Sequence, residues 1–215
     1  MTPDDLEATV VDHLSQDFFT GTVRAVFDAR VFAAELSADR FEPAEAENLR
    51  PLFVRAKLNE YLRGVADLLP GCTTNVETTP GSPMKRTVLR GGPVSLTAHA
   101  VSRPCGRVKD YLYRQSMAEG NQLSLFQPEM QPTDTLYVTL LHGPYRGRTP
   151  EEWRAYRNLP GSVYLAFPTA GLQHYVHKID LIHRFPDLID SLLPNTWDGQ
   201  ARIYYKWQAS AQSVA

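Results

Sequence analysis

The chain has 215 residues, of which 43% are apolar and 21% charged, and its formal net charge at pH 7 is −2. These values are ordinary for a globular protein and allow one large or two small domains with a sizeable core. No stretch approaches the ~20 consecutive apolar residues of a membrane span. The acidic residues 1–7 do not have the basic character of a secretory signal. We therefore expect a cytoplasmic protein without membrane contact.

The cysteines indicate neither a disulfide framework nor a metal centre. Cys72 and Cys105 stand apart in the sequence, and neither has the close Cys or His spacing that zinc and redox motifs require. We expect reduced thiols in a buried or loop position. The sequence predicts no metal ion and no other cofactor.

Charge is distributed unevenly along the chain. Residues 1–72 contain 13 acidic and 7 basic side chains, a balance of −6, whereas residues 73–215 have a balance of +4. Between residues 85 and 114, seven basic side chains accompany a single acid, Asp110. A basic patch of this kind can contact phosphates, but a solvated surface explains it as well. The candidates for phosphate or nucleic-acid contact are Arg86, Arg103, Arg107, Lys109 and Arg114, with Arg146 and Arg148 from a later glycine- and proline-containing loop.

The first third of the chain has a helical pattern. Pro3 suits the first position of a helix, and apolar residues follow it at helical spacing. A second helix is predicted over residues 23–36, after an interruption at Gly21. A third is predicted over residues 43–69, broken or bent near Pro51.

After Gly71 the composition turns towards Thr, Val and Pro, which favours strands. The clearest strand is 93–102, where apolar and polar residues alternate. The full set of predicted strands is 73–79, 84–89, 93–102, 135–141, 162–167, 173–182 and 201–207. Short helices are predicted over 107–119, from 149 to 157 and over 186–193.

These patterns together predict an α+β fold. Residues 1–70 form a helical N-terminal region, and residues 71–207 form a mainly β region with a largely antiparallel sheet and short helices. A loop at 120–132 interrupts the second region. Residues 208–215 are small and polar, which is typical of a flexible tail.

The loop carries a short apolar segment, Gln122-Leu123-Ser124-Leu125-Phe126, between polar and proline-containing flanks. The segment contains no β-branched residue and does not alternate as a half-buried strand would. Prolines at 128 and 132 lack the backbone donor that a central strand needs. An apolar cluster carried on a loop is typical of a contact site. The alternative is that its side chains pack on their own domain.

The five residues resemble the clamp-binding pentapeptide of bacterial replication and repair proteins, usually written Gln-Leu-(Ser/Asp)-Leu-Phe. In that family the pentapeptide docks polymerases, mismatch-repair proteins and clamp loaders on the ring-shaped sliding clamp, the β subunit of polymerase III. All five positions match. The resemblance covers five residues of 215, so it concerns a partner and carries no information on the fold.

The resemblance implies a role for each position. Leu125 and Phe126 would fill a hydrophobic pocket of the clamp, Leu123 would occupy the approach to it, and Gln122 would be hydrogen-bonded at one end. Ser124 stands at the position that the family fills with Ser or Asp. Burial of a Leu or Phe side chain contributes about 1.5–3 kcal/mol, so the peptide alone implies a modest affinity.

A second candidate region contains His174, His177, Asp180 and His183. On one strand, His174 and His177 point to opposite faces and cannot bind one metal ion together. His174 and Asp180 share a face, but polar positions of a half-exposed hairpin explain the stretch equally well. No Walker, dinucleotide-binding, zinc-protease or nucleophile-elbow motif occurs. We therefore single out no catalytic residue.

The resulting hypothesis is a non-enzymatic binder of the bacterial sliding clamp that competes with replication proteins. Such a protein is similar to the clamp-binding toxins of toxin–antitoxin modules, which would add a cognate antitoxin as a partner. One alternative is a repair enzyme or nuclease that the clamp recruits to DNA. Another is an interaction or regulatory module in which residues 122–126 are structural.

Overall fold

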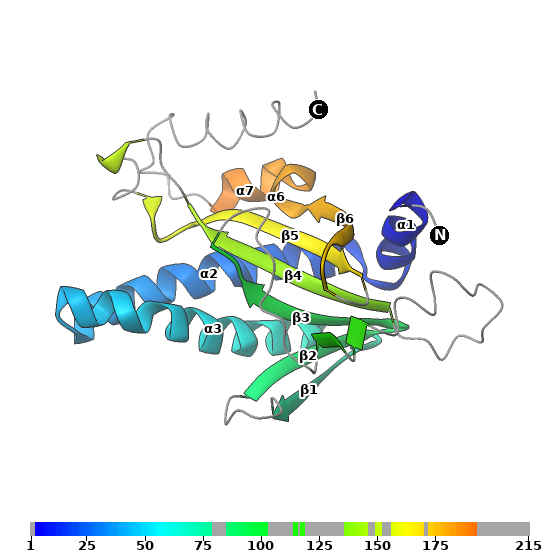
Figure 1. The fold of residues 1–215 in the computed structure, drawn as a ribbon, viewed down its shortest axis with the longest axis horizontal. Helices are drawn as coiled ribbons and strands as arrows, with labels where there is room; N and C mark the ends of the chain where they lie inside the picture. Colours follow the sequence, from blue (N-terminus) through cyan, green and yellow to red (C-terminus); the bar gives the residue numbers. More distant parts are fainter. Residues whose placement is uncertain are drawn as a thin grey trace.

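Three helices precede a six-stranded sheet in the computed structural model (Figure 1). The structure describes residues 3–78, 85–102, 114–115, 117–118, 136–145, 149–151, 156–169 and 172–192. Within these ranges the helical part ends at Leu68 and is followed by a mostly antiparallel sheet with short helices. The predicted α+β fold is thereby confirmed.

The helices are α1 (Pro3–His13), α2 (Gln16–Arg40) and α3 (Pro43–Leu68). The predicted interruption at Gly21 is wrong, because α2 runs through it. A Cβ atom at Gly21 would lie 3.1 Å from Cγ1 of Val65 on α3, so the glycine allows the two helices to pack closely. Likewise α3 is not broken at Pro51. Its buried positions pack against α2 and the sheet and hold the helix together around the missing donor.

The sheet has the strand order β1-β2-β3-β4-β5-β6. Four of the neighbouring pairs are antiparallel, and β3 and β4 are parallel, with Val94 opposite Leu136. The parallel pair means that the chain leaves β3 at one end of the sheet and enters β4 at the other. The strands are β1 (Cys72–Thr78), β2 (Lys85–Gly91), β3 (Val94–Ala100), β4 (Leu136–Pro144), β5 (Pro160–Pro168) and β6 (Tyr175–Asp180).

The main core lies between the helices and one face of the sheet, which we call the helix face. Leu96, Val138 and Leu165 contribute to it from three neighbouring strands, and Phe18 and Leu62 contribute from α2 and α3. The helical region and the sheet therefore share one core. In Figure 1 the α2–α3 hairpin projects beyond the left end of the sheet.

The end of β6 differs from the predicted strand 173–182. The strand stops at Asp180, whose side chain accepts hydrogen bonds from the backbone N–H groups of Ile182 and His183. This cap starts the short helix α6 (Leu181–Arg184), and α7 (Pro186–Leu192) follows it. Sequence periodicity misses the change because Leu181 and Ile182 continue the apolar pattern of the strand.

Three predicted segments lie outside the described residues, namely the loop 120–132, the strand 201–207 and the tail 208–215. Of the predicted helix 107–119, the described residues 114, 115, 117 and 118 are helical. None of the helices in the described part of the chain combines the length and apolar character needed to cross a lipid bilayer.

Two glycines provide a matched test of the packing. A Cβ atom at Gly161 on β5 would lie 2.7 Å from both the carbonyl oxygen of Pro144 and Cα of Tyr145, whereas Gly64 on α3 has open space around it. We expect Gly161→Ala to lower the free energy of unfolding by about 1–3 kcal/mol, since backbone must move. Gly64→Ala should raise it by about 0.4–1 kcal/mol. Urea unfolding measures both, and unchanged stability of Gly161→Ala would contradict the close β4–β5 approach.

Candidate functional site

The second face of the sheet, opposite the helix face, carries buried polar side chains. Thr97 and His99 alternate on β3 with residues of the main core, and Tyr137 lies on the neighbouring β4. All three side chains are buried, and His99 is only 8% exposed. Buried polar groups are stable when they are hydrogen-bonded to one another, and these three are.

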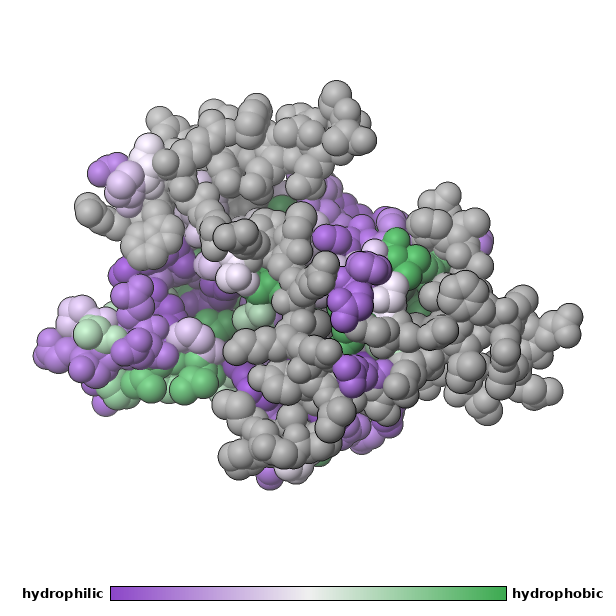
Figure 2. All heavy atoms as spheres, viewed as in Figure 1, coloured by the Kyte–Doolittle hydropathy of each residue, from purple (hydrophilic) through white to green (hydrophobic). Residues whose placement is uncertain are grey.

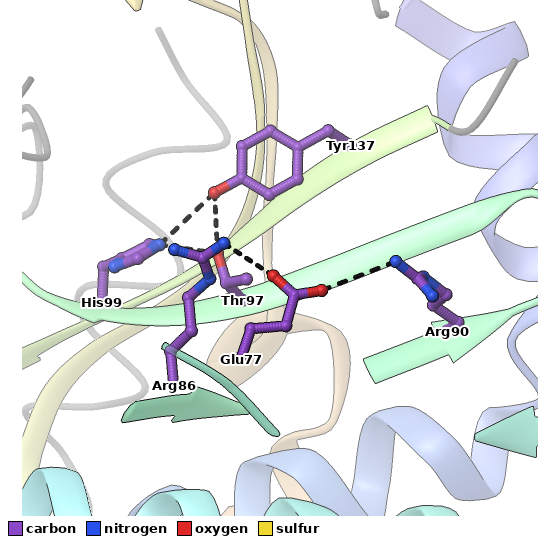
Figure 3. A network of polar contacts seen from close by, with 6 residues as sticks. All are labelled: Glu77, Arg86, Arg90, Thr97, His99 and Tyr137. Carbon is purple, nitrogen blue, oxygen red and sulfur yellow. Dashed lines mark hydrogen bonds and ion pairs between the residues drawn. The ribbon is translucent and has the colours of Figure 1, made fainter. Parts of the chain in front are cut away.

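Figure 3 shows the polar ends of His99, Thr97 and Tyr137 converging. Nε2 of His99 and the Tyr137 hydroxyl each lie 2.7 Å from Oγ1 of Thr97, and Nε2 lies 3.4 Å from that hydroxyl. On the other side of the ring, Nη2 of Arg114 lies 2.9 Å from Nδ1. Because a guanidinium only donates, Nδ1 must accept. His99 is therefore neutral with its proton on Nε2, and it donates to Thr97.

An ion-pair cluster lies beside this network on β1 and β2. The carboxylate of Glu77 lies between two guanidinium groups, 2.6 Å from Nη2 of Arg86 and 3.6 Å from Nη2 of Arg90 (Figure 3). The Arg86 side chain is only 11% exposed, so its pairing with Glu77 is largely desolvated. The second face thus combines one carboxylate with three arginines once Arg114 is included.

The network holds the helical residues 114, 115, 117 and 118 on the second face. Arg114 is buried and bonded to His99, and Ala118 is fully buried in a small cluster with Tyr137 and Leu172. Met117 packs against the same cluster. Tyr137 therefore takes part in both contacts, through its hydroxyl in the polar network and through its ring in the apolar cluster. The chain is fixed to the sheet at Ala118, four residues before Gln122.

Burial and nearby cations set the protonation of two histidines. Burial holds the pKa of His99 well below its ordinary value of 6.5, and the charge of Arg114 lowers it further. Burial also lowers the pKa of His142, on the helix face of β4, to about 3, with a second contribution from Arg30. Both rings are neutral at pH 7, which agrees with the tautomer that the hydrogen bonds require for His99.

Of the predicted phosphate contacts, the structure describes Arg86 and Arg114. It brings them together around His99, whose pKa both lower. Their described hydrogen bonds are internal, to Glu77 and to His99. Arg103, Arg107, Lys109, Arg146 and Arg148 lie outside the described residues, as do the five predicted partner-binding residues Gln122, Leu123, Ser124, Leu125 and Phe126.

The second histidine region is engaged in structural contacts. His177 stacks obliquely on Phe167, with ring centroids 5.9 Å apart, and its Nε2 lies 3.5 Å from the carboxylate of Glu7 on α1. His183 lies 2.5 Å from the carboxylate of Asp180, the same side chain that caps α6. Within the described ranges, no three His, Cys, Asp or Glu side chains are grouped to hold a metal ion.

Sequence reasoning did not identify the network of Thr97, His99 and Tyr137. Alternation correctly predicts that Val94, Leu96 and Ala98 of β3 share a face, and it leaves Thr97 and His99 on the other. The signal that could have indicated the network is the presence of Thr97 and His99, two polar residues, on one face of a strand that has a neighbouring strand on each side. Of their partners, Arg114 lies within the long connection between β3 and β4 and Tyr137 lies beyond it, so spacing alone cannot pair them.

The described network is suited to positioning a chain segment. Its donors and acceptors bond to one another, and its histidine is neutral over the physiological pH range.

Comparisons of the chain with protein-family models, with curated proteins and with solved structures found no match in any of the three.

The two buried histidines predict acid sensitivity. Below pH 6.5 a histidine of the unfolded chain binds a proton that His99 and His142 do not bind in the fold, so the free energy of unfolding falls as the pH falls. Each contributes up to about 1.4 kcal/mol per pH unit. We expect urea unfolding to show a loss of about 2–3 kcal/mol between pH 6 and pH 5.

His99→Gln is the matched variant, because a glutamine amide accepts from Arg114 and donates to Thr97 but does not titrate. It should reduce the pH dependence of unfolding by about half over the same interval. An unchanged slope would show that His99 is not buried as a neutral group.

Proposed function

We propose that the chain binds the bacterial sliding clamp through residues 122–126 and competes there with replication proteins. The observation that carries the proposal is the match of Gln122-Leu123-Ser124-Leu125-Phe126 to all five positions of the clamp-binding pentapeptide. Leu125 and Phe126 are the anchors in this proposal, and Gln122 is the polar contact.

The sheet topology supports a role for the segment outside the sheet interior. The segment belongs to the connection between β3 and β4, and each of these strands already has a described neighbour on both sides. Among the described strands, the outer edges of β1 and β6 are the positions at which a further strand could be added. Insertion of residues 122–126 between two described strands is therefore disfavoured, whereas the topology is compatible with packing of their side chains on their own domain.

The anchor at residues 114–118 supports the proposal in a second way. Four residues extend at most about 14 Å, so a clamp that holds Gln122 would lie close to Ala118 and the second face. Contacts between the clamp and this part of the domain would then form at high effective concentration. They would raise the modest affinity of the peptide alone.

Competition is the role that follows for a client without DNA chemistry of its own. The pentapeptide pocket of the clamp is shared by many clients, so occupation by one excludes another. We propose a non-enzymatic competitor similar to the clamp-binding toxins, with an antitoxin as a second partner. Recruitment of a repair enzyme or nuclease to DNA is the alternative role, and direct phosphate contact by Arg86 or Arg114 would belong to it.

Clamp binding is tested by calorimetry with a purified bacterial sliding clamp. Removing two buried anchors with Leu125→Ala/Phe126→Ala costs about 3–6 kcal/mol, so we expect binding to weaken by at least about 100-fold. Gln122→Ala should weaken binding by less. Ser124→Asp is the matched control, since the family accepts Asp at this position, and it should keep the affinity of the original chain.

The melting temperatures of the same variants distinguish docking from packing. If residues 122–126 are a docking segment, each variant should have the same melting temperature as the unchanged chain. A double variant that loses about 2–5 kcal/mol of stability per truncated side chain would place the segment in a core and overturn the proposal. An unchanged chain that does not bind the clamp would overturn it as well.

Competition predicts inhibition of clamp-dependent DNA synthesis. Primer extension by a polymerase III assembly should slow as the protein is added, and excess clamp should restore it because the competitor is titrated away. Leu125→Ala/Phe126→Ala should not inhibit. Cleavage or modification of naked DNA by the protein alone would favour the recruited enzyme instead.

A further inference from the structure

A hollow of about 640 Å³ lies at the projecting turn between α2 and α3. Its size is within the ~300–1,000 Å³ range of small-molecule sites. The wall is formed by the last turn of α2, the first two turns of α3 and Arg157. Arg157 lies in the segment that immediately precedes β5. Elements far apart in the sequence therefore meet at one concave surface.

Two arginines contribute to the lining of this surface. Arg50 and Arg157 both line the hollow, and the charge of Arg157 is felt at Arg50. Burial lowers the pKa of Arg50 and the charge of Arg157 lowers it further, while Glu47 acts in the opposite direction. Nε of Arg50 is buried and has no hydrogen-bond partner among the described residues. A half-buried guanidinium in the same hollow as a second cation is an arrangement that an anion would stabilise.

An aromatic ring and carboxylates complete the lining. Phe41 packs obliquely on Phe53, with ring centroids 6.0 Å apart, and remains 39% exposed where it lines the hollow. Figure 2 shows apolar surface along the lower side of this projecting hairpin. Glu42 and Glu47 lie on the α3 side, and Glu42 makes no capping hydrogen bond to the helix.

We propose that this hollow binds a mononucleotide. Arg50 and Arg157 would bind the phosphate, the exposed ring of Phe41 would stack on the base, and the carboxylates of Glu42 and Glu47 would accept hydrogen bonds from ribose hydroxyls or base N–H groups. Each part of the lining thus has a matching part in the ligand. The site is independent of clamp binding.

The charge of the lining favours a small nucleotide over nucleic acid. Three acids, Asp39, Glu42 and Glu47, balance its three arginines, and Arg40 is paired with Asp39 at 2.9 Å. A long polyanion would meet these carboxylates along its backbone and gain no net attraction. One phosphate group between Arg50 and Arg157 avoids most of that repulsion.

The proposal is tested by calorimetry of the full chain with AMP, ATP, adenosine, GMP and inorganic phosphate. We expect the nucleotides to bind more tightly than either adenosine or phosphate, since two parts of the site act together. Arg50→Gln should weaken nucleotide binding at least 10-fold, and Phe41→Ala should weaken it several-fold. Arg24→Gln, an exposed arginine of α2 outside the lining, is the matched control and should bind as the unchanged chain does.

Each variant is first shown to melt as the unchanged chain does, and Phe41→Leu replaces Phe41→Ala if the alanine variant unfolds. Absence of binding by every nucleotide at millimolar concentration would overturn the proposal. Equal binding of phosphate and nucleotides, with no effect of the Phe41 variant, would overturn the nucleotide assignment. Nucleotide binding that survives Arg50→Gln would place the ligand elsewhere on the chain.

Discussion

The parallel pairing of β3 and β4 is the constraint on which the proposed site depends. Antiparallel neighbours can be joined by short turns, as β2 and β3 are, but parallel neighbours require the chain to return along the sheet. A crossover of about a dozen residues is sufficient for this return. Residues 101–135 are about three times as many, so the connection has length for a second task. The pentapeptide lies in this excess.

Burial of His99 and Arg114 indicates that the connection is positioned, since a polar network is not the most stabilising way to cover a sheet. Well-packed apolar residues often stabilise as much as a buried charged pair. The network defines a specific geometry that apolar packing does not, because a planar guanidinium, a single histidine tautomer and the Thr97 hydroxyl fit together in one arrangement. We infer that it fixes where residues 114–118 sit on the second face, while Met117 and Ala118 supply the apolar contact.

Local patterns in the sequence were sufficient for most elements of the fold, but not for their partners. Alternation located β3, and Pro43 and Pro70 bounded α3 closely. The predicted interruption at Gly21 is wrong because this glycine allows close packing against Val65, which lies on another helix. Alternation is also the same for parallel and antiparallel strands, so the β3–β4 orientation was not predicted. The His99 network was missed for a similar reason, since Arg114 and Tyr137 approach His99 only after the crossover is folded.

A competitor for the clamp must overcome clients that carry the same kind of peptide, so the peptide alone gives it no advantage. The advantage has to come from the domain behind it. Because Ala118 is fixed to the sheet four residues before Gln122, the folded body would be held against the clamp whenever the segment is docked. A body held in this way blocks the surface around the pocket as well as the pocket itself. A short connection from a buried anchor therefore suits exclusion of other clients, whereas a long linker would suit recruitment of an enzyme that must reach DNA.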